Sequence, residues 1–436
     1  MAAKLGRALG TENIDSRVRQ SDFRGGAEGA PWLGSSIDEL LASKSILFVG
    51  STIRKEQPLL TARLRGAAKR GLAVNLVHVT DDDLLMPVAN KSIVRPAALT
   101  AALAEVAKAA GGKGDNAIAK SLSDKPSAII LGHYAQQHPD FGVLLAMAQE
   151  IGRITGATLG VLPDGANAVG AHLAGAVPRG KGLDARAMIQ APRRGYVVMG
   201  VEAELDMGPA ALDAIERSEF TLALTAYRNA TTERAHVMLP IVPFTETGGT
   251  FVNMEGRAQS FNAVVKPQGD ARPAWKVLRM LGSLLDIPGF QGETLQQIQT
   301  SIAPDLAAWA KQGLGAKPAK FEWQVHTPAA SGLERIAEFG IYAGDPVVRR
   351  SPPLQRTADG KAGRAVRLNA ATAAKAGLAA GDRIRVMQGG GEARLNVLID
   401  AGTPDGCVRI ARGVPETAAL GEGAITLEKV AVEVAA

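Results

Sequence analysis

The amino-acid sequence predicts an α/β protein with doubly wound, mostly parallel sheets and a small β-barrel near its C-terminal end. Up to about residue 300, apolar runs of strand length alternate with amphipathic stretches of helical period. From Ala365 onward the predicted strands become short and are separated by turns. Hydrophobic residues make up 46% of the chain and aromatic residues only 4%. A core built mainly from Ala, Leu, Val and Ile suits helices packed on a mostly parallel sheet.

The first predicted unit is a strand, a helix and a second strand. Ser45–Gly50 is an apolar run that ends in glycine, which is typical of a buried strand. Pro58 suits the first position of a helix, where its missing N–H costs nothing, and Gly71 suits the helix end. Ala73–Val79 is the second strand. Two strands joined through a helix in this way lie parallel.

The same alternation continues along the chain. Strands at Ser127–Gly132 and Ala157–Leu162 flank a helix at Phe141–Thr155, whose Leu, Met and Ile side chains share one face. The later elements are predicted as strands at Tyr196–Val201, Phe220–Thr225 and Ala235–Leu239 and as helices at Pro209–Ser218 and Pro273–Leu285.

A change of pattern introduces the predicted barrel. Gly313–Lys320 is small and polar, which is typical of a linker. Gly389–Gly391 is interpreted as a hairpin turn, because a triple glycine between two strands seldom cradles phosphate. Thr403–Gly406 forms another predicted turn. The barrel strands are predicted at Val366–Leu368, Arg383–Met387, Ala393–Ile399 and Val408–Ala411.

Composition excludes several classes of protein. No apolar run approaches the roughly 18–20 residues of a membrane-spanning helix, and no secretory signal is present, so we expect a soluble, cytoplasmic protein. The one cysteine, Cys407, excludes a disulfide framework within the chain and an all-cysteine cluster or zinc site. The net charge is +6, but the basic residues are scattered and aromatics are few. An acidic protein partner is therefore favoured over nucleic acid.

Few residues in the chain suggest catalysis. No nucleophile elbow or P-loop is present. The six histidines, including His133 and His138, are interpreted as structural because no cysteine lies near them. Asp81–Asp83 are interpreted as a turn or helix cap, with a Mg²⁺ site as the alternative. Gly50-Ser51-Thr52 could bind phosphate through backbone N–H groups, but every doubly wound fold has a turn there.

The segment Leu239–Gln259 (LPIVPFTETGGTFVNMEGRAQ) is richer in polar groups than a plain connection. Buried polar side chains must find hydrogen-bond partners, so such a density predicts a specific arrangement. One interpretation is a long loop locked by its carboxylates and Arg257. The other is the wall of a binding pocket. The sequence leaves both open.

This segment resembles the signature loop of the molybdopterin oxidoreductase superfamily. Thr11–Arg17 is similar to the segment that follows the iron–sulfur domain of that family, and Leu47–Pro58 is similar to its first nucleotide-binding βαβ unit. Asp345–Ser351 and Asn369–Val386 resemble the lead-in and the repeat pattern of its C-terminal barrel, the domain that closes over the pterin. The resemblance covers nearly the whole chain and keeps the order of the family.

Two further loops resemble one branch of that superfamily, the G subunit of NADH-quinone oxidoreductase (complex I). They are Leu162–Gly170, which is followed by Ala174–Pro178, and Tyr227–Thr231, which runs into Ala235–Pro240. The family carries N-terminal cysteine-rich modules that hold iron–sulfur clusters, and no such module is present in this sequence.

The departures from the family pattern imply an altered cofactor site. Ser21 falls near the position of the metal ligand in active members. The Asn of the first βαβ turn is replaced within Gly50-Ser51-Thr52, and Val79-Thr80-Asp81 replaces an Asp-Pro-Arg. Pro96-Ala97-Ala98-Leu99 replaces a Pro-Gly-Thr-Asp, where Ala97 adds a Cβ and the lost Asp removes an acceptor. These losses together imply a vacated pocket.

The resemblance implies a structural and docking role in the peripheral arm of NADH-quinone oxidoreductase, which transfers electrons from NADH to quinone. The chain would carry no cofactor, because molybdopterin is lost and the clusters belong to the missing region. The expected partners are other peripheral-arm subunits, without nucleic acid or membrane insertion, on the cytoplasmic side of the inner membrane. The vestigial cofactor-binding candidates are Ser21, Gly50, Ser51, Glu246, Asn253, Glu255 and Arg257.

Two other functions remain open. One is an active, formate-dehydrogenase-like molybdopterin oxidoreductase with Ser21 as the metal ligand. The other is a soluble interaction module that uses the fold alone. In each case three regions are expected: a remnant of a truncated N-terminal region at 1–34, an α/β region at 35–335 and a dinucleotide-binding-like barrel at 340–436.

Overall fold

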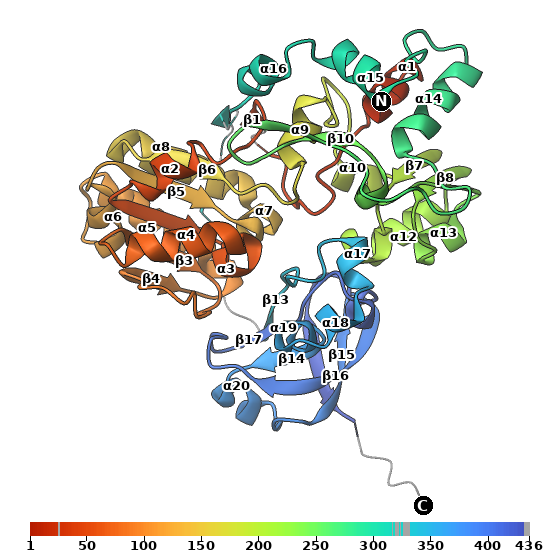
Figure 1. Cartoon of the computed structure of the whole chain (residues 1–436). Coiled ribbons are helices and arrows are strands. Elements are labelled where there is room, and N and C mark those ends of the chain that lie inside the picture. Colours follow the sequence, from red (N-terminus) through yellow and green to blue (C-terminus); the bar gives the residue numbers. More distant parts are fainter. Residues whose placement is uncertain (25–26, 316, 319–321, 323, 326–331, 431–436) are drawn as a thin grey trace, which may run out of the picture. The chain divides into compact units, whose positions relative to one another are not determined.

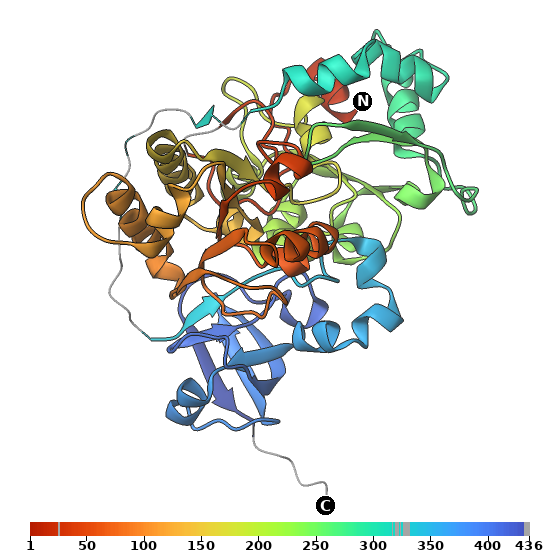
Figure 2. The ribbon, with the colours of Figure 1, turned by 60° about the vertical axis from the view of Figure 1, so that its left-hand side comes forward.

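The chain forms two compact units, which are described separately below. The computed structural model describes residues 1–24, 27–315, 317–318, 322, 324–325 and 332–430 (Figures 1 and 2). Unit 1 comprises Met1–Gln20, Glu28–Trp32 and Pro163–Ala316, and unit 2 comprises Ser21–Ala27, Leu33–Leu162 and Lys317–Ala436. The predicted linker at Gly313–Lys320 lies partly outside the described residues.

The centre of unit 2 is a five-stranded parallel sheet in the order β4-β3-β2-β5-β6. All five side chains of β2 and of β5 are buried, because helices cover both faces of a parallel sheet. The chain runs outward from β2 to β3 and, later, outward in the other direction from β5 to β6. The strands are β2 (Ser45–Val49), β3 (Ala73–His78), β4 (Asn90–Ile93), β5 (Ser127–Leu131) and β6 (Thr158–Val161).

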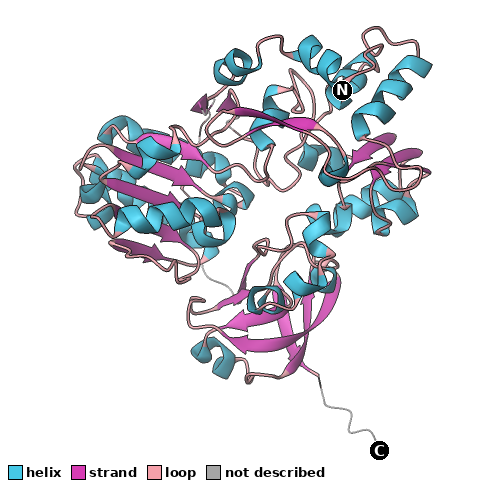
Figure 3. Ribbon diagram, viewed as in Figure 1, coloured by secondary structure: helices cyan, strands magenta, loops and turns pink. Residues whose placement is uncertain are grey.

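The helices of this sheet lie on its two faces (Figure 3). Because parallel crossovers are right-handed, α4 packs on one face, and α5 and α8 pack together on the other. Helix α4 opens with Pro58 at its first position, and α8 ends at Gly156 in a left-handed conformation, so both ends follow ordinary capping rules. The helices are α2 (Ile37–Leu41), α3 (Ile53–Glu56), α4 (Pro58–Ala68), η1 (Pro96–Ala98), α5 (Leu99–Ala110), α6 (Ala117–Leu122), α7 (His133–Gln137) and α8 (Phe141–Thr155).

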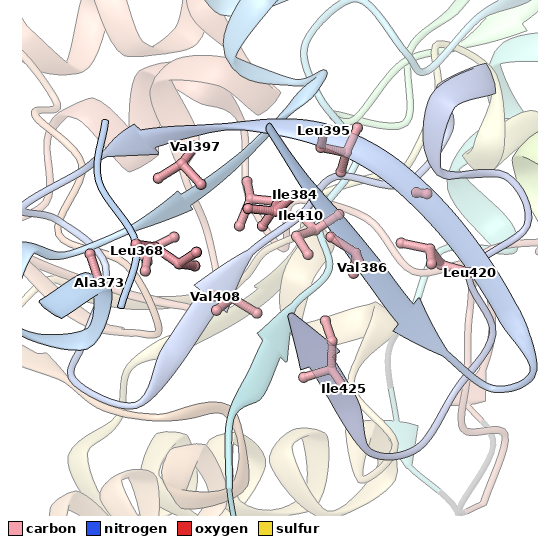
Figure 4. Packing of buried hydrophobic residues seen from close by; sticks show 13 residues of the cluster. Leu368, Ala373, Ile384, Val386, Leu395, Val397, Val408, Ile410, Leu420 and Ile425 are labelled. Carbon is pink, nitrogen blue, oxygen red and sulfur yellow. The ribbon is translucent and has the colours of Figure 1, made fainter. Parts of the chain in front are cut away.

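The C-terminal part of unit 2 is a six-stranded sheet in the order β13-β17-β14-β16-β15-β18, with β13 and β18 at its edges. The sheet curls into a half-barrel around a cluster of buried aliphatic side chains that includes Leu368, Ile384 and Ile410 (Figure 4). The strands are β13 (Glu334–Ile336), β14 (Ala365–Leu368), β15 (Arg383–Gln388), β16 (Gly391–Ile399), β17 (Cys407–Arg409) and β18 (Ile425–Lys429). The short helices are α17 (Pro346–Arg349), α18 (Pro352–Gln355), α19 (Ala358–Ala362), α20 (Ala370–Lys375) and η3 (Pro415–Thr417).

A two-residue turn joins β15 to β16. Gln388 and Gly391 are the last paired residues of this antiparallel hairpin, and Gly389 and Gly390 adopt φ values of +58° and +82°. Two successive positive φ values match the twist of a tight hairpin and favour glycine at both positions. The prediction of a hairpin turn at the triple glycine is therefore confirmed.

Unit 1 is built on a three-stranded parallel sheet in the order β7-β8-β9. Its core joins Leu222 and Leu224 of β8 to Leu278 and Phe290, and Leu5 of the N-terminal helix packs into the same cluster. A separate antiparallel hairpin pairs β10 with β11. The strands are β7 (Gly195–Met199), β8 (Phe220–Thr225), β9 (Val237–Pro240), β10 (Gly249–Val252) and β11 (Ala258–Phe261).

The remaining elements of unit 1 are mostly short helices. They are α1 (Ala2–Ala8), α9 (Ala168–Leu173), α10 (Ala185–Gln190), α11 (Ala203–Asp206), α12 (Pro209–Glu216), α13 (Ala230–Arg234), η2 (Phe244–Glu246), α14 (Ala274–Leu284), α15 (Leu295–Ile302) and α16 (Leu306–Gln312). The two remaining strands, β1 (Ala27–Glu28) and β12 (Lys317–Pro318), are short and pair with each other. No helix among the described residues is both long and apolar enough to cross a bilayer.

The predicted fold class is confirmed: the sheets carrying helices are parallel, and the C-terminal sheet is curled. Elements predicted from apolar runs lie within one or two residues of their positions in the structure. Leu239–Gln259 differs from the prediction of a long loop, because β10 and the start of β11 lie inside it. Thr250 and Phe251 favour this extended pairing.

Candidate functional site

The carboxyl edge of the five-stranded sheet is the candidate site in unit 2. The crossovers leave β2 and β5 in opposite directions, so a crevice is expected where these neighbouring strands end. Open α/β sheets bind ligands at such a switch point. The loops at this edge include Gly50-Ser51-Thr52 after β2, Thr80–Asp83 after β3 and the start of α7 after β5.

Gly50 allows the turn after β2 to approach α7 closely. Its φ is +56°, and its carbonyl oxygen accepts a hydrogen bond of 3.1 Å from the Ala135 N–H. A Cβ at position 50 would lie only 2.6 Å from the Ala135 nitrogen. Only glycine fits this conformation and this contact without strain. Gly50 therefore has a packing role in addition to its predicted place in the cofactor site.

The polar groups of this turn are engaged by Glu56 at the end of α3. Its Oε1 accepts a hydrogen bond of 2.9 Å from the Thr52 N–H, and its Oε2 accepts one of 2.9 Å from the Ser51 hydroxyl. The same Oε2 accepts a bond of 3.1 Å from the His133 N–H at the start of α7. Burial raises the pKa of the Glu56 carboxyl, against the effect of these donors. The protein's own carboxylate thus occupies the donors that could serve a phosphate.

The three aspartates after β3 each have a partner within the protein. Asp81 pairs with Lys91 at 2.6 Å, and the Asp83 side chain accepts a hydrogen bond of 2.7 Å from the Leu85 N–H. Asp82 accepts hydrogen bonds from the Thr52 and Thr80 hydroxyls, both at 3.3 Å, and pairs with Arg409. Among the described residues, no group of three or more His, Cys, Asp or Glu side chains is placed to hold a metal ion.

Arg409, on β17 of the half-barrel, is fully buried and lies at the centre of an ion network. Its guanidinium donates to both oxygens of Asp82, at 2.8 and 2.6 Å, and also to Glu338. Although burial alone would raise the pKa of Asp82, the hydrogen bond and charge of Arg409 hold that pKa far below its usual value. The pKa of Glu338 is lowered too, because the charges of Arg409 and Arg367 outweigh burial.

A second arginine completes this network. Arg367 of β14 lies directly opposite Arg409 in the antiparallel register. It pairs with Glu338 at 3.2 Å and with Asp400 at 3.5 Å, and Asp400 also lies 3.5 Å from Arg409. The network therefore joins three carboxylates to two guanidiniums across the half-barrel and the sheet edge. We call Asp82, Glu338, Arg367, Asp400 and Arg409 the Arg409 network.

Pro96–Leu99 is the third segment that departs from the family pattern. It too contacts a charged side chain. Glu334 of β13 accepts a hydrogen bond of 3.0 Å from the Ala97 N–H. Its other oxygen lies 2.8 Å from Nε of Arg95, and Arg95 also donates to the Gly332 carbonyl at 3.0 Å. A backbone donor in η1, just before α5, is thus used within the protein.

Ser21 lies in unit 2, beside a tightly bonded aspartate. The Ser21 N–H lies 3.5 Å from the Gln136 carbonyl oxygen. The neighbouring Asp22 is buried, accepts a hydrogen bond of 2.8 Å from the Gly142 N–H and pairs with Arg24 at 2.9 Å. Gly50 and Ser51 lie in the same unit.

The other four candidates lie in unit 1, at the β10–β11 hairpin and its approach. The Asn253 side-chain oxygen accepts hydrogen bonds from the N–H groups of Glu255, at 2.9 Å, and Arg257, at 3.0 Å. The Asn253 amide donates to the Glu255 carboxylate at 3.3 Å. Glu246 accepts a bond of 3.2 Å from the Gln268 N–H, whereas the Arg257 side chain is exposed. Asn253 is therefore the residue that organises this turn.

Two family models match the chain. The model described as molybdopterin oxidoreductase matches residues 1–284, and the Molydopterin dinucleotide binding domain matches residues 344–431. The chain belongs to the molybdopterin oxidoreductase family. The second match covers most of the half-barrel, and the loops of the carboxyl edge lie within the first.

Curated relatives of this family member include the G subunits of bacterial NADH-quinone oxidoreductases. That of Mycobacterium bovis is 27% identical over 88% of this chain and 51% of its own length. That of Streptomyces coelicolor is 31% identical over 48% of this chain and 25% of its own length. The chain thus spans about half the length of the mycobacterial relative. Among solved structures, acetylene hydratase from Pelobacter acetylenicus aligns with a TM-score of 0.62 at 14% identity, covering 96% of this chain and 77% of the other. That likeness shows the fold alone.

The sequence did not reveal the side chains that engage the three departing loops. Glu56 follows Thr52 by four residues, one more than the spacing of a capping box, so a search for that motif would not have found it. Arg409 and Glu334 are distant from Asp82 and Ala97 in sequence, by 327 and 237 positions. No local pattern signals contacts of that separation.

Proposed function

We propose that this chain is a structural and docking component of the peripheral arm of an NADH-quinone oxidoreductase, with a degenerate molybdopterin site. The relatives named as G subunits of that enzyme support the assembly. One observation supports the structural role: charged side chains of the chain itself engage each of the three loops that depart from the cofactor-binding pattern, or the residue next to it. Glu56 binds the Thr52 N–H of the first loop, Arg409 pairs with Asp82 directly after the second, and Glu334 binds the Ala97 N–H of the third.

The residues at this edge do not fit a bound molybdopterin. A ligand at the β2 turn would compete with Glu56 for the N–H groups of Thr52 and His133. A ligand that bound the Asp82 carboxylate after β3 would have to displace the fully buried Arg409. Separating a buried ion pair costs about 3–5 kcal/mol, because it leaves a charge without a partner. Cofactor binding here would therefore work against the fold.

Electron transfer in such an assembly would run through clusters outside this chain. The one cysteine is Cys407, which is buried, and burial raises the pKa of its thiol to about 11. Iron–sulfur clusters are held by several thiolates, which one protonated thiol cannot supply. The role that remains is to hold neighbouring subunits on the cytoplasmic side of the membrane without a cofactor of its own.

The experiment is purification of the tagged chain from membranes of its native cells. We expect the other peripheral-arm subunits to co-purify with it, with molybdenum and pterin far below one per chain by elemental analysis and by fluorescence of the oxidised pterin. Deletion of the gene should reduce the amount of assembled arm but leave every iron–sulfur signal in the arm that remains. Unchanged assembly would contradict the docking role.

The active-oxidoreductase alternative, with Ser21 as ligand, makes the opposite prediction. One molybdenum and one pterin cofactor per chain would overturn the degenerate site. A third outcome, neither molybdenum nor respiratory subunits, would identify an interaction module that uses the fold alone. The metal content and the partners are measured on the same preparation, so the three functions are separated in one experiment.

A further inference from the structure

We propose that the Arg409 network is a ligand-independent clamp that fixes the half-barrel on the carboxyl edge of the five-stranded sheet. The proposal goes beyond the function proposed above, because it concerns how the two parts of unit 2 hold together, whichever partners the chain has. Asp82 extends from the sheet, and Arg409, Arg367, Glu338 and Asp400 come from the half-barrel side.

The charges of this clamp nearly cancel. The three carboxylates of the network face two guanidiniums and the Lys55 ammonium, which lies 3.9 Å from Asp82 and also 3.7 Å from a fourth carboxylate, Asp359 on α19. The side chain of Arg409 has no exposed surface, and that of Asp82 is 15% exposed. Desolvated charges of this kind are tolerated only when they are paired and hydrogen-bonded. The charged side chains of the sheet edge and of the half-barrel therefore stabilise the contact between these two parts.

The clamp continues into the sheet through uncharged groups. The Thr52 hydroxyl, which donates to Asp82, also lies 3.0 Å from Nε2 of His78. His78 is buried on β3, and its ring meets Tyr134 of α7 edge-on at 5.8 Å between centroids. Arg409 is therefore linked through Asp82 and Thr52 to the buried residues of the sheet, which hold Asp82 in place.

Two backbone N–H groups of the sheet part also donate hydrogen bonds to the half-barrel, so their exchange rates report whether the two parts stay together. The Asp81 N–H donates a hydrogen bond of 2.8 Å to the Gly402 carbonyl in the turn after β16. A Cβ on Gly402 would lie 2.7 Å from the Asp81 carbonyl oxygen, so the two loops are in close contact. The Ala97 N–H makes the second contact, with Glu334. Exchange of the Asp81 amide with solvent requires this hydrogen bond to the half-barrel to break.

The experiment is hydrogen–deuterium exchange of the full chain, followed on the peptide that contains Asp81. Asp82→Asn keeps the size of the side chain and removes its charge, and Arg409→Met keeps much of the volume. We expect each variant to accelerate exchange of this peptide about tenfold or more. The controls are Asp83→Asn, at the adjacent aspartate that caps the Leu85 N–H, and Arg394→Met, at an exposed arginine on β16. Both controls should exchange at the wild-type rate.

Three results would overturn the clamp. The first is wild-type exchange at Asp81 in both Asp82→Asn and Arg409→Met. The second is an equal acceleration in β8 of unit 1, which would mean that the variants destabilise the whole chain. The third is faster exchange at Asp81 in the wild-type chain produced in cells that make no molybdopterin, because a cofactor would then hold the half-barrel. If Arg409→Met does not fold, Asp82→Asn alone decides. Assembly of the respiratory arm is not measured, so failure here leaves the proposed function standing.

Discussion

The guanidinium of Arg409 meets the carboxylate of Asp82 in a two-point contact, with Nη1 2.8 Å from Oδ1 and Nη2 2.6 Å from Oδ2. The two residues lie 327 positions apart. Paired, parallel hydrogen bonds of this kind combine charge with a fixed geometry. They make the junction between sheet and half-barrel specific for these two side chains.

Arg409→Met should strongly destabilise the protein. The substitution removes the main cation of Asp82 and Glu338, which are both largely buried, and we expect a loss of about 3–5 kcal/mol in the free energy of unfolding. The matched control is Arg385→Met on β15, where the ion pair with Glu428 is exposed and contributes at most about 1 kcal/mol. Urea unfolding followed by circular dichroism measures both. Equal losses of unfolding free energy in the two variants would show that the buried Arg409 pair contributes no more to stability than an exposed pair.

Stability should fall as the pH drops from about 6.5 to 4, partly through His78. Burial lowers the pKa of His78 from 6.5 to about 4. The charge of Arg409 also lowers this pKa, whereas the charges of Glu338 and Asp82 raise it. The unfolded chain therefore takes up a proton at this histidine before the folded chain does, and the stability present at neutral pH is lost on acidification. His78→Gln, which can still donate to Thr52, should reduce the slope of unfolding free energy against pH in this range. A slope identical to that of the wild type would contradict the assignment.

Glu56→Ala should destabilise unit 2. The substitution deprives three donors of their acceptor: the Ser51 hydroxyl and the N–H groups of Thr52 and His133. Leaving buried donors without partners costs about 1–3 kcal/mol, although removal of a carboxylate whose pKa is raised by burial offsets part of this. Glu105→Ala on α5 is the control, because Glu105 is exposed and pairs only loosely with Lys108, at 3.8 Å. Thermal unfolding by calorimetry compares the two, and a smaller effect at position 56 than at 105 would refute the prediction.

Gly50→Ala should cost more than its backbone conformation alone explains. A left-handed residue with a side chain costs roughly 1–2 kcal/mol. At position 50 the added Cβ would also meet the Ala135 backbone at 2.6 Å and force the start of α7 outward. Gly112→Ala is the control, since φ there is +80° and nothing lies within 4 Å of an added Cβ. We expect the difference between the two variants, measured by chemical unfolding, to exceed about 1 kcal/mol.

Asn253→Ala should loosen the β10–β11 hairpin, whereas Arg257→Ala should not. The Asn253 side chain accepts two backbone hydrogen bonds in the turn, and its loss should cost about 1 kcal/mol. Arg257 is exposed, so its truncation should stay within about 0.5 kcal/mol. Trp309 and Trp32 pack against the cluster that contains Val252, so tryptophan fluorescence reports on this region during unfolding. A larger effect at Arg257 would favour the prediction that this arginine locks the segment.

The periodicity of apolar residues was sufficient to predict most of the regular fold. Runs such as Ser45–Val49 and Ser127–Leu131 are buried on both faces, and such burial leaves an unbroken apolar signature in the sequence. Short or polar elements were missed. β4 (Asn90–Ile93) lies at the edge of its sheet and carries three polar residues out of four, so no apolar period marks it.

The candidate site was predicted only in outline. Motif order indicated the family, and three loops were seen to depart from the family's cofactor-binding pattern. The sequence did not indicate which side chains lie at those loops. Of the groups that do so, Glu56 lies within the same local segment, but Arg409 and Glu334 come from the half-barrel.

By itself, the sequence determined the family, the alternation of strands and helices, and the positions at which the cofactor pattern is broken. These properties follow from the spacing of apolar residues and from short motifs, which depend only on residues close together in the sequence. The tertiary structure alone decided that Asp82 pairs with Arg409 and that Ala97 pairs with Glu334. Such contacts arise when the half-barrel packs on the sheet, and burial then requires every charge brought there to find a partner.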